Sequence, residues 1–263
     1  MTAFEELAAI EAIARQAGEL ALAMRADGLT IRAKEGGSPV TNADEAVDAM
    51  LAAQLSTLCP DYGWLSEETA DDPARLTKRR LFVVDPIDGT VAFMKGRPWW
   101  CVSIAVVEDG QPILGVVHAP EPGETYTAVA GGGAFLNGAP IAPSARAELA
   151  GCRMLGDAKM FQHPAWPRAW PPMQIETRNS IAYRMALVAA GAFDAALALS
   201  AKSEWDLAAA DLICREAGAW VTDHRGRTFA YNRPRPSMPS LVCAAPALGP
   251  LILERVSPID LRD

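Results

Sequence analysis

The sequence predicts a mixed fold, in which residues 1–145 form an α+β portion and residues 146–263 form an α/β portion. Three observations lead to this class. Apolar residues repeat at helical spacing near the N-terminus, short β-rich runs joined by turn residues follow, and strands alternate with helices beyond Ala145. The chain has 263 residues, half of them hydrophobic, which is enough for a large buried core.

Two helices are predicted in the first 60 residues. Apolar side chains from Phe4 to Leu20 recur every three or four positions, which predicts a helix over 3–26 that ends at Gly28. A second helix is predicted over about 44–57, because Asn42 and Glu45 have the spacing of a capping box. Residues 34–44 should form a loop that runs into this helix.

Short β-rich runs predict strands over 63–65, 81–84 and 101–107. Asp109-Gly110 is typical of a hairpin turn and should join the last of these to a strand over 113–118, which predicts an antiparallel sheet. The glycine-rich residues 128–138 fit neither a dinucleotide-binding nor a P-loop pattern. They predict a hairpin with an Asn137-Gly138 turn.

The second portion alternates between strands and helices. Strands are predicted over 153–155 and 193–199, and helices over 180–190 and 204–217. The Pro- and Trp-rich segment 163–172 could be a lid or a loop packed on the surface, and loop statistics favour the packed loop.

Composition excludes several classes of function. The net charge of -8, with no Lys/Arg block, argues against nucleic-acid or anionic-membrane partners. Five scattered cysteines without a CxxC pair indicate neither a disulfide framework nor a zinc site. The N-terminal stretch lacks the pattern of a signal peptide, and no run of ~20 apolar residues could span a bilayer. These observations predict a soluble cytoplasmic protein.

Residues 85–90, DPIDGT, follow the predicted strand over 81–84. Pro86 should force a turn that brings Asp88 to the same side as Asp85. Gly89 and Thr90 precede an apparent short helix, and their backbone N–H groups could bind phosphate there. The alternative is that Asp88 only caps this helix and Asp85 is a solvated turn residue.

Two more acidic elements strengthen the functional interpretation. Glu67 and Glu68 follow another apolar strand end, and Asp206 lies in the first turn of the helix over 204–217. Adjacent surface glutamates and a Ser203–Asp206 capping box would explain them equally well in isolation. Together, acids without matching His or Cys ligands form an oxygen-only site that favours Mg²⁺ or Mn²⁺. About two or three such ions could support hydrolysis of a phosphate ester by water.

The segments EET (67–69), DPIDGT (85–90) and WDLAAADLICREAGA (205–219) resemble, in order and spacing, the signature set of the inositol monophosphatase family of lithium-sensitive, magnesium-dependent phosphatases. The resemblance implies a layered αβαβα sandwich of the inositol monophosphatase and fructose-1,6-bisphosphatase type. It also implies phosphomonoester hydrolysis, inhibition by Li⁺ and, because relatives are commonly dimers, a homodimer.

The resemblance also implies roles for individual residues. The implied metal ligands are Glu67, Asp85, the carbonyl of Ile87, Asp88 and Asp206. Asp88, Gly89 and Thr90 would contact the phosphate, and Asp44 and Thr90, together with Glu67 through its metal, would activate the attacking water. Glu68 would lie behind these ligands. Lys34 either balances the acidic charge or is an ordinary exposed lysine.

The substrate is left open at this level. Inositol-specific relatives carry a glutamate where this chain has Leu199, whereas Lys95 or Arg97 could meet the second phosphate of an adenosine bisphosphate. A small phosphorylated metabolite is therefore expected, with inositol phosphate, a 3'(2'),5'-bisphosphate nucleotide and histidinol phosphate as candidates. A metal- and anion-binding regulatory protein is the non-enzymatic alternative. An aspartyl-phosphate phosphatase is disfavoured, because its acids are spaced DxDxT.

Overall fold

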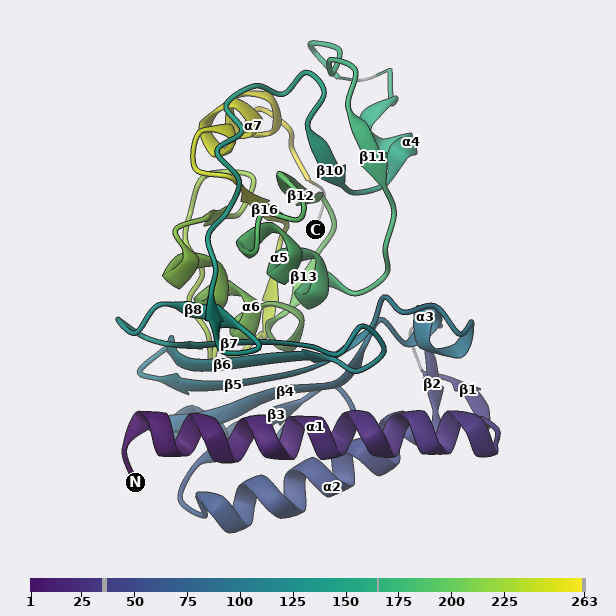
Figure 1. Ribbon diagram of the computed structural model, residues 1–263, viewed down its shortest axis with the longest axis vertical. Helices are drawn as coiled ribbons and strands as arrows, with labels where there is room; N and C mark the ends of the chain where they lie inside the picture. Colours follow the sequence, from purple (N-terminus) through teal and green to yellow (C-terminus); the bar gives the residue numbers. More distant parts are fainter. Residues whose placement is uncertain (35–36, 165, 262–263) are drawn as a thin grey trace.

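The computed structural model describes residues 1–34, 37–164 and 166–261, and its layers alternate in the order helix, sheet, helix, sheet, helix (Figure 1). This arrangement confirms the predicted mixed class and the αβαβα sandwich. The helices are α1 (Ala3–Asp27), α2 (Asn42–Leu58), the 3-10 helix η1 (Pro73–Thr77), α3 (Thr90–Met94), α4 (Ala158–Phe161), α5 (Ile181–Ala189), α6 (Glu204–Ala217) and α7 (Leu248–Val256).

Two sheets separate the helical layers. The larger sheet has the order β3-β4-β5-β6-β7-β8-β9, and only its β3–β4 pair is parallel among the described strands. Its strands are β3 (Gly63–Ser66), β4 (Arg80–Asp88), β5 (Cys101–Glu108), β6 (Gln111–Ala119), β7 (Glu124–Val129), β8 (Ala134–Leu136) and β9 (Ala139–Pro140). The smaller sheet has the order β11-β10-β12-β16-β14. Its strands are β10 (Arg153–Leu155), β11 (Gln174–Glu176), β12 (Ala195–Ala198), β14 (Trp220–Thr222) and β16 (Leu241–Ala244). Two short pairs lie outside these sheets: β1 (Ile31–Ala33) with β2 (Pro39–Thr41), and β13 (Lys202–Ser203) with β15 (Ser237–Met238).

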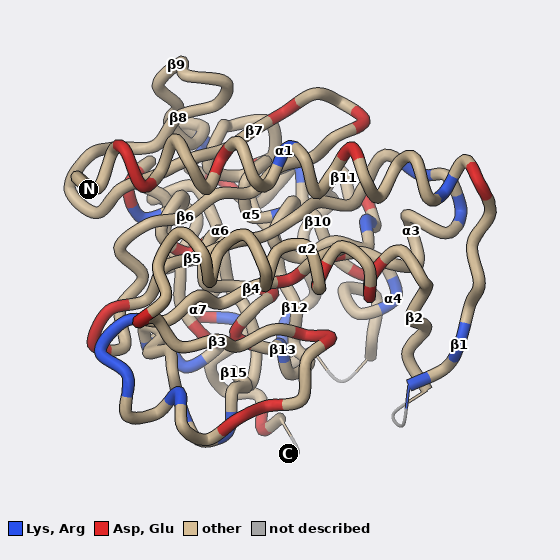
Figure 2. The backbone as a smooth tube through the Cα atoms, turned by 90° about the horizontal axis from the view of Figure 1, so that it is seen from below, with Lys and Arg blue, Asp and Glu red and all other residues tan. Residues whose placement is uncertain are grey.

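Alternation along β4 explains how the layers form. Leu81 and Val83 join the hydrophobic cluster that contains α5 and α6, whereas Phe82 and Val84 join the cluster that contains α1 and α2. Helices α1 and α2 lie side by side across this outer face (Figure 2). Because α5 and α6 follow residue 145 yet cover a sheet that precedes it, the two portions of the chain share one core. The same packing carries Asp206 of α6 towards the end of β4.

Most predicted elements are confirmed, but the loop predicted over 34–44 and the start of α2 are corrections. Residues 39–41 of that loop form β2, α2 begins at Asn42, and residues 35–36 lie outside the described residues. The N-cap is Thr41, and the reciprocal capping box joins Thr41 to Asp44 rather than Asn42 to Glu45. Both hairpin turns are confirmed. Asp109 and Gly110 have φ of 48° and 80°, and Asn137 and Gly138 have φ of 50° and 80°, the left-handed values that a two-residue turn requires. Trp166 and Trp170 pack against the cluster that contains α7, which supports the packed interpretation of segment 163–172. None of the described helices is both long and apolar enough to cross a membrane.

Candidate active site

Asp85 and Asp88 lie on the same side of β4 because the strand contains a β-bulge. Asp85 pairs with Ser103 of β5 and Asp88 pairs with Cys101, so three steps along β4 oppose two steps along β5. Without the extra residue, side chains three positions apart would point to opposite faces of the sheet. The prediction that the strand ends at Asp85 is therefore wrong. Pro86 falls inside the bulge, where its missing N–H is tolerated.

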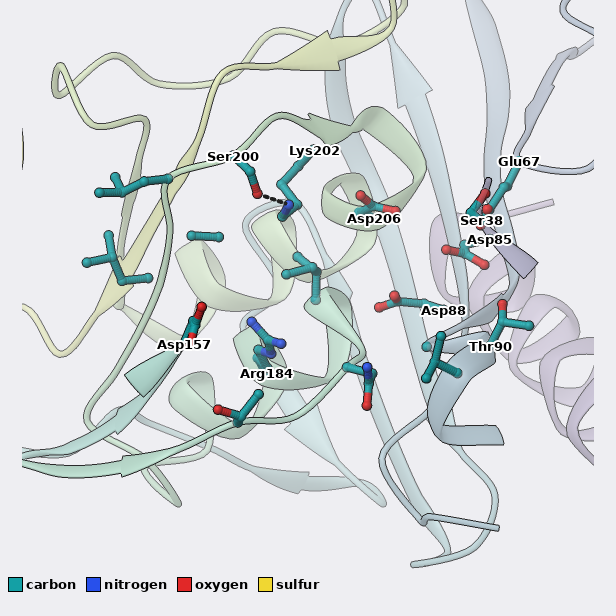
Figure 3. Close-up of a pocket in the computed structure, with 18 of the residues that line it drawn as sticks. Ser38, Glu67, Asp85, Asp88, Thr90, Asp157, Arg184, Ser200, Lys202 and Asp206 are labelled. Atoms are coloured by element: carbon teal, nitrogen blue, oxygen red, sulfur yellow. Dashed lines mark hydrogen bonds between the residues drawn. The ribbon is translucent and has the colours of Figure 1, made fainter. Parts of the chain in front are cut away.

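Asp206 completes a cluster of three aspartates. One carboxylate oxygen from each of Asp85, Asp88 and Asp206 lies within 4.8 Å of the others. Figure 3 shows these side chains pointing towards one another from β4 and from the first turn of α6. Burial, followed by the charges of neighbouring acids, raises the pKa of Asp85 well above its usual range. The cluster thus holds excess negative charge that a cation would neutralise.

Each of these aspartates uses one oxygen to hold the fold and leaves the other for the site. The Asp85 Oδ1 accepts a hydrogen bond from the N–H of Ile87 at 3.1 Å, while its Oδ2 is buried without a hydrogen-bond partner among the described residues. The Asp206 Oδ2 accepts from the N–H of Ser203 at 3.0 Å, as the predicted capping box requires. Capping and ligand binding are therefore compatible for Asp206, since they use different atoms.

Asp88 is anchored by helix α5, which sequence reasoning missed. Its Oδ2 accepts hydrogen bonds from the Ser180 hydroxyl and the Ala182 N–H, both at 2.6 Å. Asp88 does not cap α3, because the N-cap of α3 is Gly89 and forms no side-chain bond. The alternative of a simple cap with a solvated Asp85 is therefore wrong. A serine directly before an apolar helical run was the available signal for Ser180.

Gly89 and Thr90 connect the cluster to Asp44. Gly89 has a φ of 96°, and a Cβ there would lie 2.9 Å from the Trp99 carbonyl oxygen, so only glycine fits. The Thr90 hydroxyl lies 3.1 Å from the Asp44 Oδ1 and 3.2 Å from the Ile87 carbonyl oxygen, and its single proton can be donated to only one of them at a time.

Asp44 is held rigidly from the other side. Its Oδ2 accepts from the Thr41 N–H at 2.8 Å and from the Thr41 hydroxyl at 2.5 Å. Burial raises the pKa of Asp44, partly opposed by these bonds. The same capping box that starts α2 therefore directs the Oδ1 of Asp44 at Thr90.

Glu67 and Glu68 are not a solvated surface pair. The Lys34 ammonium donates to one carboxylate oxygen of each at 2.7 Å, and the Glu68 side chain is only 7% exposed. Burial raises the pKa of Glu68 to about 7, although Lys34 opposes that shift. Glu67 lies outside the aspartate trio but lines the same cavity, beside Asp85 (Figure 3). Lys34 thus has the position of a charge-balancing group and not of an ordinary exposed lysine.

Asp48 is a second residue that the sequence reasoning missed. It lies one helical turn after Asp44 on α2, and its two oxygens accept from the Ser66 hydroxyl at 2.5 Å and the Thr69 hydroxyl at 2.6 Å. These two hydroxyls flank Glu67 and Glu68. Asp48 therefore fixes both ends of the segment that carries the glutamates. The recurrence of an acid at i+4 on a helix was the available signal.

If the segment that Asp48 fixes carries the predicted metal ligand Glu67, Asp48→Asn should weaken the response to Mg²⁺ on the order of 10-fold, as loss of a residue that orients a metal ligand does. The rate at saturating Mg²⁺ should stay close to that of the parent, because Asp48 touches neither Thr90 nor the aspartate cluster. Mg²⁺ titrations of phosphate release measure both quantities. Glu45→Gln, on the same helix but solvent-facing, is the control, and equal Mg²⁺ responses of the two variants would contradict a positioning role for Asp48.

Glu67 and the three clustered aspartates line a cavity of about 590 Å³, whose described lining also includes two cationic side chains. Figure 3 shows Arg184 of α5 and Lys202 of β13 on the wall away from Thr90. The Arg184 Nε is buried without a hydrogen-bond partner among the described residues, and the Lys202 ammonium donates to Ser200 and to the Ala201 carbonyl. Burial lowers the pKa of both cations. The signal for Arg184 was a lone cation in an otherwise apolar helix.

Lys95 and Arg97 lie outside the described lining of this cavity, and both are exposed. Arg97 stacks over the ring of Trp99, with 5.5 Å between the guanidinium carbon and the ring centroid. A role for Lys95 towards a second phosphate stays a prediction without support from this geometry. Leu199 does line the cavity, at the position where inositol-specific relatives carry a glutamate.

An αβαβα sandwich that gathers buried aspartates beside a Thr–Asp pair defines the class of metal-dependent phosphate-ester hydrolases. Residues 4–259 match the inositol monophosphatase family, and the chain belongs to this family. It is 32% identical over 233 residues to a 3'(2'),5'-bisphosphate nucleotidase CysQ of Aggregatibacter actinomycetemcomitans, covering 84% of this chain and 85% of that protein.

Relatives with other activities are equally similar. A histidinol-phosphatase of Chlorobaculum parvum is 34% identical over 222 residues, covering 82% of this chain and 84% of that protein. Among solved structures, the inositol monophosphatase of Thermotoga maritima superposes with a TM-score of 0.84 at 29% identity, covering 97% of each chain. The comparisons therefore show a phosphatase family without resolving the substrate.

The residues present fit the divalent cations on which this family depends. Asp85, Asp88 and Asp206 offer only oxygen ligands, which hard cations such as Mg²⁺ prefer. The buried, unpartnered Oδ2 of Asp85 supports this interpretation, because an orphaned carboxylate oxygen is costly unless a cation or a proton satisfies it.

Proposed function

We propose that the protein hydrolyses the phosphomonoester of a small phosphorylated metabolite, with Mg²⁺, or Mn²⁺ in its place, as cofactor. The observation that carries the proposal is the aspartate cluster with its unpartnered Asp85 oxygen. Beside it, the Thr90 hydroxyl donates a hydrogen bond to Asp44 at 3.1 Å. The proposed metal ligands are Glu67, Asp85, the Ile87 carbonyl, Asp88 and Asp206. Divalent ions held there would neutralise phosphate charge and lower the pKa of a nearby water.

Side chains and backbone N–H groups of the protein orient the water, accept its proton and hold the phosphate. The Thr90 hydroxyl orients the attacking water, and Asp44 receives its proton through Thr90. A raised pKa makes Asp44 a better proton acceptor than an exposed carboxylate, and the Thr41 bonds keep its accepting oxygen in place. The N–H groups of Gly89 and Thr90 would hold the phosphate, and Lys34 would balance the charge of Glu67 and Glu68.

Release of inorganic phosphate tests this function directly. The panel comprises inositol 1-phosphate, adenosine 3',5'-bisphosphate, histidinol phosphate and glycerol 2-phosphate, each with Mg²⁺ and with chelator. We expect Mg²⁺-dependent release from at least one substrate, inhibited when Li⁺ is added, by family resemblance. Release that is the same with chelator as with Mg²⁺ would contradict the proposal and favour a metal- and anion-binding regulatory protein.

A second candidate, a 3'(2'),5'-bisphosphate nucleotidase, is favoured by Arg184 and Lys202. Two half-buried cationic side chains that line one cavity would attract a second anionic group on the substrate and disfavour the ammonium of histidinol phosphate. The apolar Leu199 offers no acceptor to an inositol hydroxyl. These two features favour a bisphosphate nucleotide over inositol phosphate and histidinol phosphate as the substrate.

Arg184→Ala should raise the KM for adenosine 3',5'-bisphosphate roughly 10- to 100-fold, the value of a charge-assisted hydrogen bond, and change that for adenosine 3'-monophosphate little. Arg79→Ala removes a guanidinium whose side chain is 72% exposed and outside the cavity lining, and serves as the control. Equal losses on both substrates would rule out a second-phosphate contact.

A further inference from the structure

An apolar slot of about 320 Å³ adjoins the catalytic cavity. Its lining comprises Met160, His163, Trp166, Leu199 and Ile259. Met160 and Leu199 also line the catalytic cavity, so the two hollows share a wall. A ligand that extends from the aspartate cluster past Leu199 would reach the slot.

The wall of the slot is braced by an aromatic stack. The Trp166 Nε1 donates to the Met160 carbonyl at 2.6 Å, which ties the segment back to α4. The Trp166 ring meets Trp170 edge to face, with 5.2 Å between centroids, and Trp170 meets Phe161 in the same way at 5.1 Å. Phe161 is buried in the cluster under α7. These contacts brace the Trp166 wall of the slot against α4 and the cluster under α7.

The chemistry of the slot selects the leaving alcohol. A polyol would bring several hydroxyls against Met160, Leu199 and Trp166, where they would lose water without gaining a partner from these three side chains. A flat aromatic ring loses little hydration and can pack against the face or edge of Trp166. Leu199 lies at the junction, so it would contact the atoms between the phosphorylated carbon and the ring.

We propose that this slot binds a flat aromatic ring of the leaving alcohol. The inference rests on the proposed phosphatase function and narrows its substrate class: the substrate is a phosphomonoester whose alcohol carries an aromatic ring, not a bare polyol. The Pro- and Trp-rich segment 163–172 then acts in specificity, by building the wall that the ring contacts.

Matched substrates test the ring contact. We expect the parent to prefer adenosine 3'-monophosphate to inositol 1-phosphate and glycerol 2-phosphate in kcat/KM. Trp166→Ala should lower kcat/KM for the nucleotide roughly 10-fold, through KM, and leave that for glycerol 2-phosphate unchanged, since removing part of an apolar pocket acts only on the group that fills it. Trp166→Phe should restore most of the loss. Histidinol phosphate and phenyl phosphate distinguish a requirement for a purine from one for any aromatic ring.

Two outcomes would overturn the proposal: a parent enzyme that prefers the ring-free substrates, or a Trp166→Ala variant that loses activity equally on all of them. Should Trp166→Ala fail to fold, Ile259→Ser puts a polar side chain at another lining position of the slot and carries the same expectation. Binding of adenosine alone, followed by calorimetric titration, is independent of turnover and of the tryptophan that the variant removes. If no substrate releases phosphate but adenosine still binds the parent and not the variant, the phosphatase function fails and the ring site stands.

Discussion

Asp88→Asn should abolish Mg²⁺-dependent phosphate release while the protein stays folded. An asparagine can place its carbonyl oxygen where the Asp88 Oδ2 accepts from Ser180 and Ala182, so the anchor to α5 is kept. Its amide group then faces Asp85 and Asp206 and cannot bind a cation. If the lost ligand stabilises the transition state by about 4 kcal/mol, the rate of phosphate release falls roughly 10³-fold. Steady-state phosphate release measures the loss.

The melting temperature of Asp88→Asn distinguishes loss of a metal ligand from misfolding. Because the substitution removes one of three crowded carboxylates, the metal-free variant should melt at pH 8 at the temperature of the parent or above it. Asp109→Asn, in a solvent-exposed hairpin turn, is the control and should keep full activity. Phosphate release at the parental rate by Asp88→Asn would show that the aspartate cluster is not the site of hydrolysis.

Stabilisation by Mg²⁺ should grow steeply with pH. Burial raises the pKa of Asp88 to about 6 and that of Asp206 to about 8, so both hold protons more tightly in the folded than in the unfolded chain. Their contribution to stability is complete below the unfolded pKa of about 4 and is lost as pH rises through about 6 and then about 8. Mg²⁺ replaces these protons, so it binds best where they have left.

Melting curves with Mg²⁺ and with chelator, at pH 5 and pH 8.5, measure this effect. At saturation near 100 times the Kd, we expect an increase in Tm of roughly 5 to 10 °C at pH 8.5 and little increase at pH 5. Asp211 and Glu204, whose pKa values burial raises to about 6, titrate with or without metal and cancel in the difference. The control Glu45→Gln should behave as the parent. An equal Mg²⁺ effect at both pH values would contradict cation binding by the cluster.

The elements that local pattern specifies were predictable. Repeats of three and four predicted α1 and α6, β-rich runs predicted β5 and β6, and Asn137-Gly138 predicted a two-residue turn, because each depends on residues near in sequence. The N-cap of α2 was misplaced by one residue, since both Thr41–Asp44 and Asn42–Glu45 satisfy a capping spacing. The path of β4 was missed because Pro86 and Gly89 favour a turn locally, whereas pairing with β5 continues the strand to Asp88.

The sequence by itself determined which acids this protein carries, and their order and spacing were sufficient to indicate the family. Only the tertiary structure decided the role of each carboxylate oxygen. In Asp44, Asp85, Asp88 and Asp206, one oxygen accepts hydrogen bonds that hold the fold and the other faces the site. Ser180, Asp48 and Arg184 likewise acquire their positions only when α5 and α2 pack against the sheet. The physical reason is that a carboxylate's partners are set by packing between distant segments, and local periodicity carries no information about such contacts.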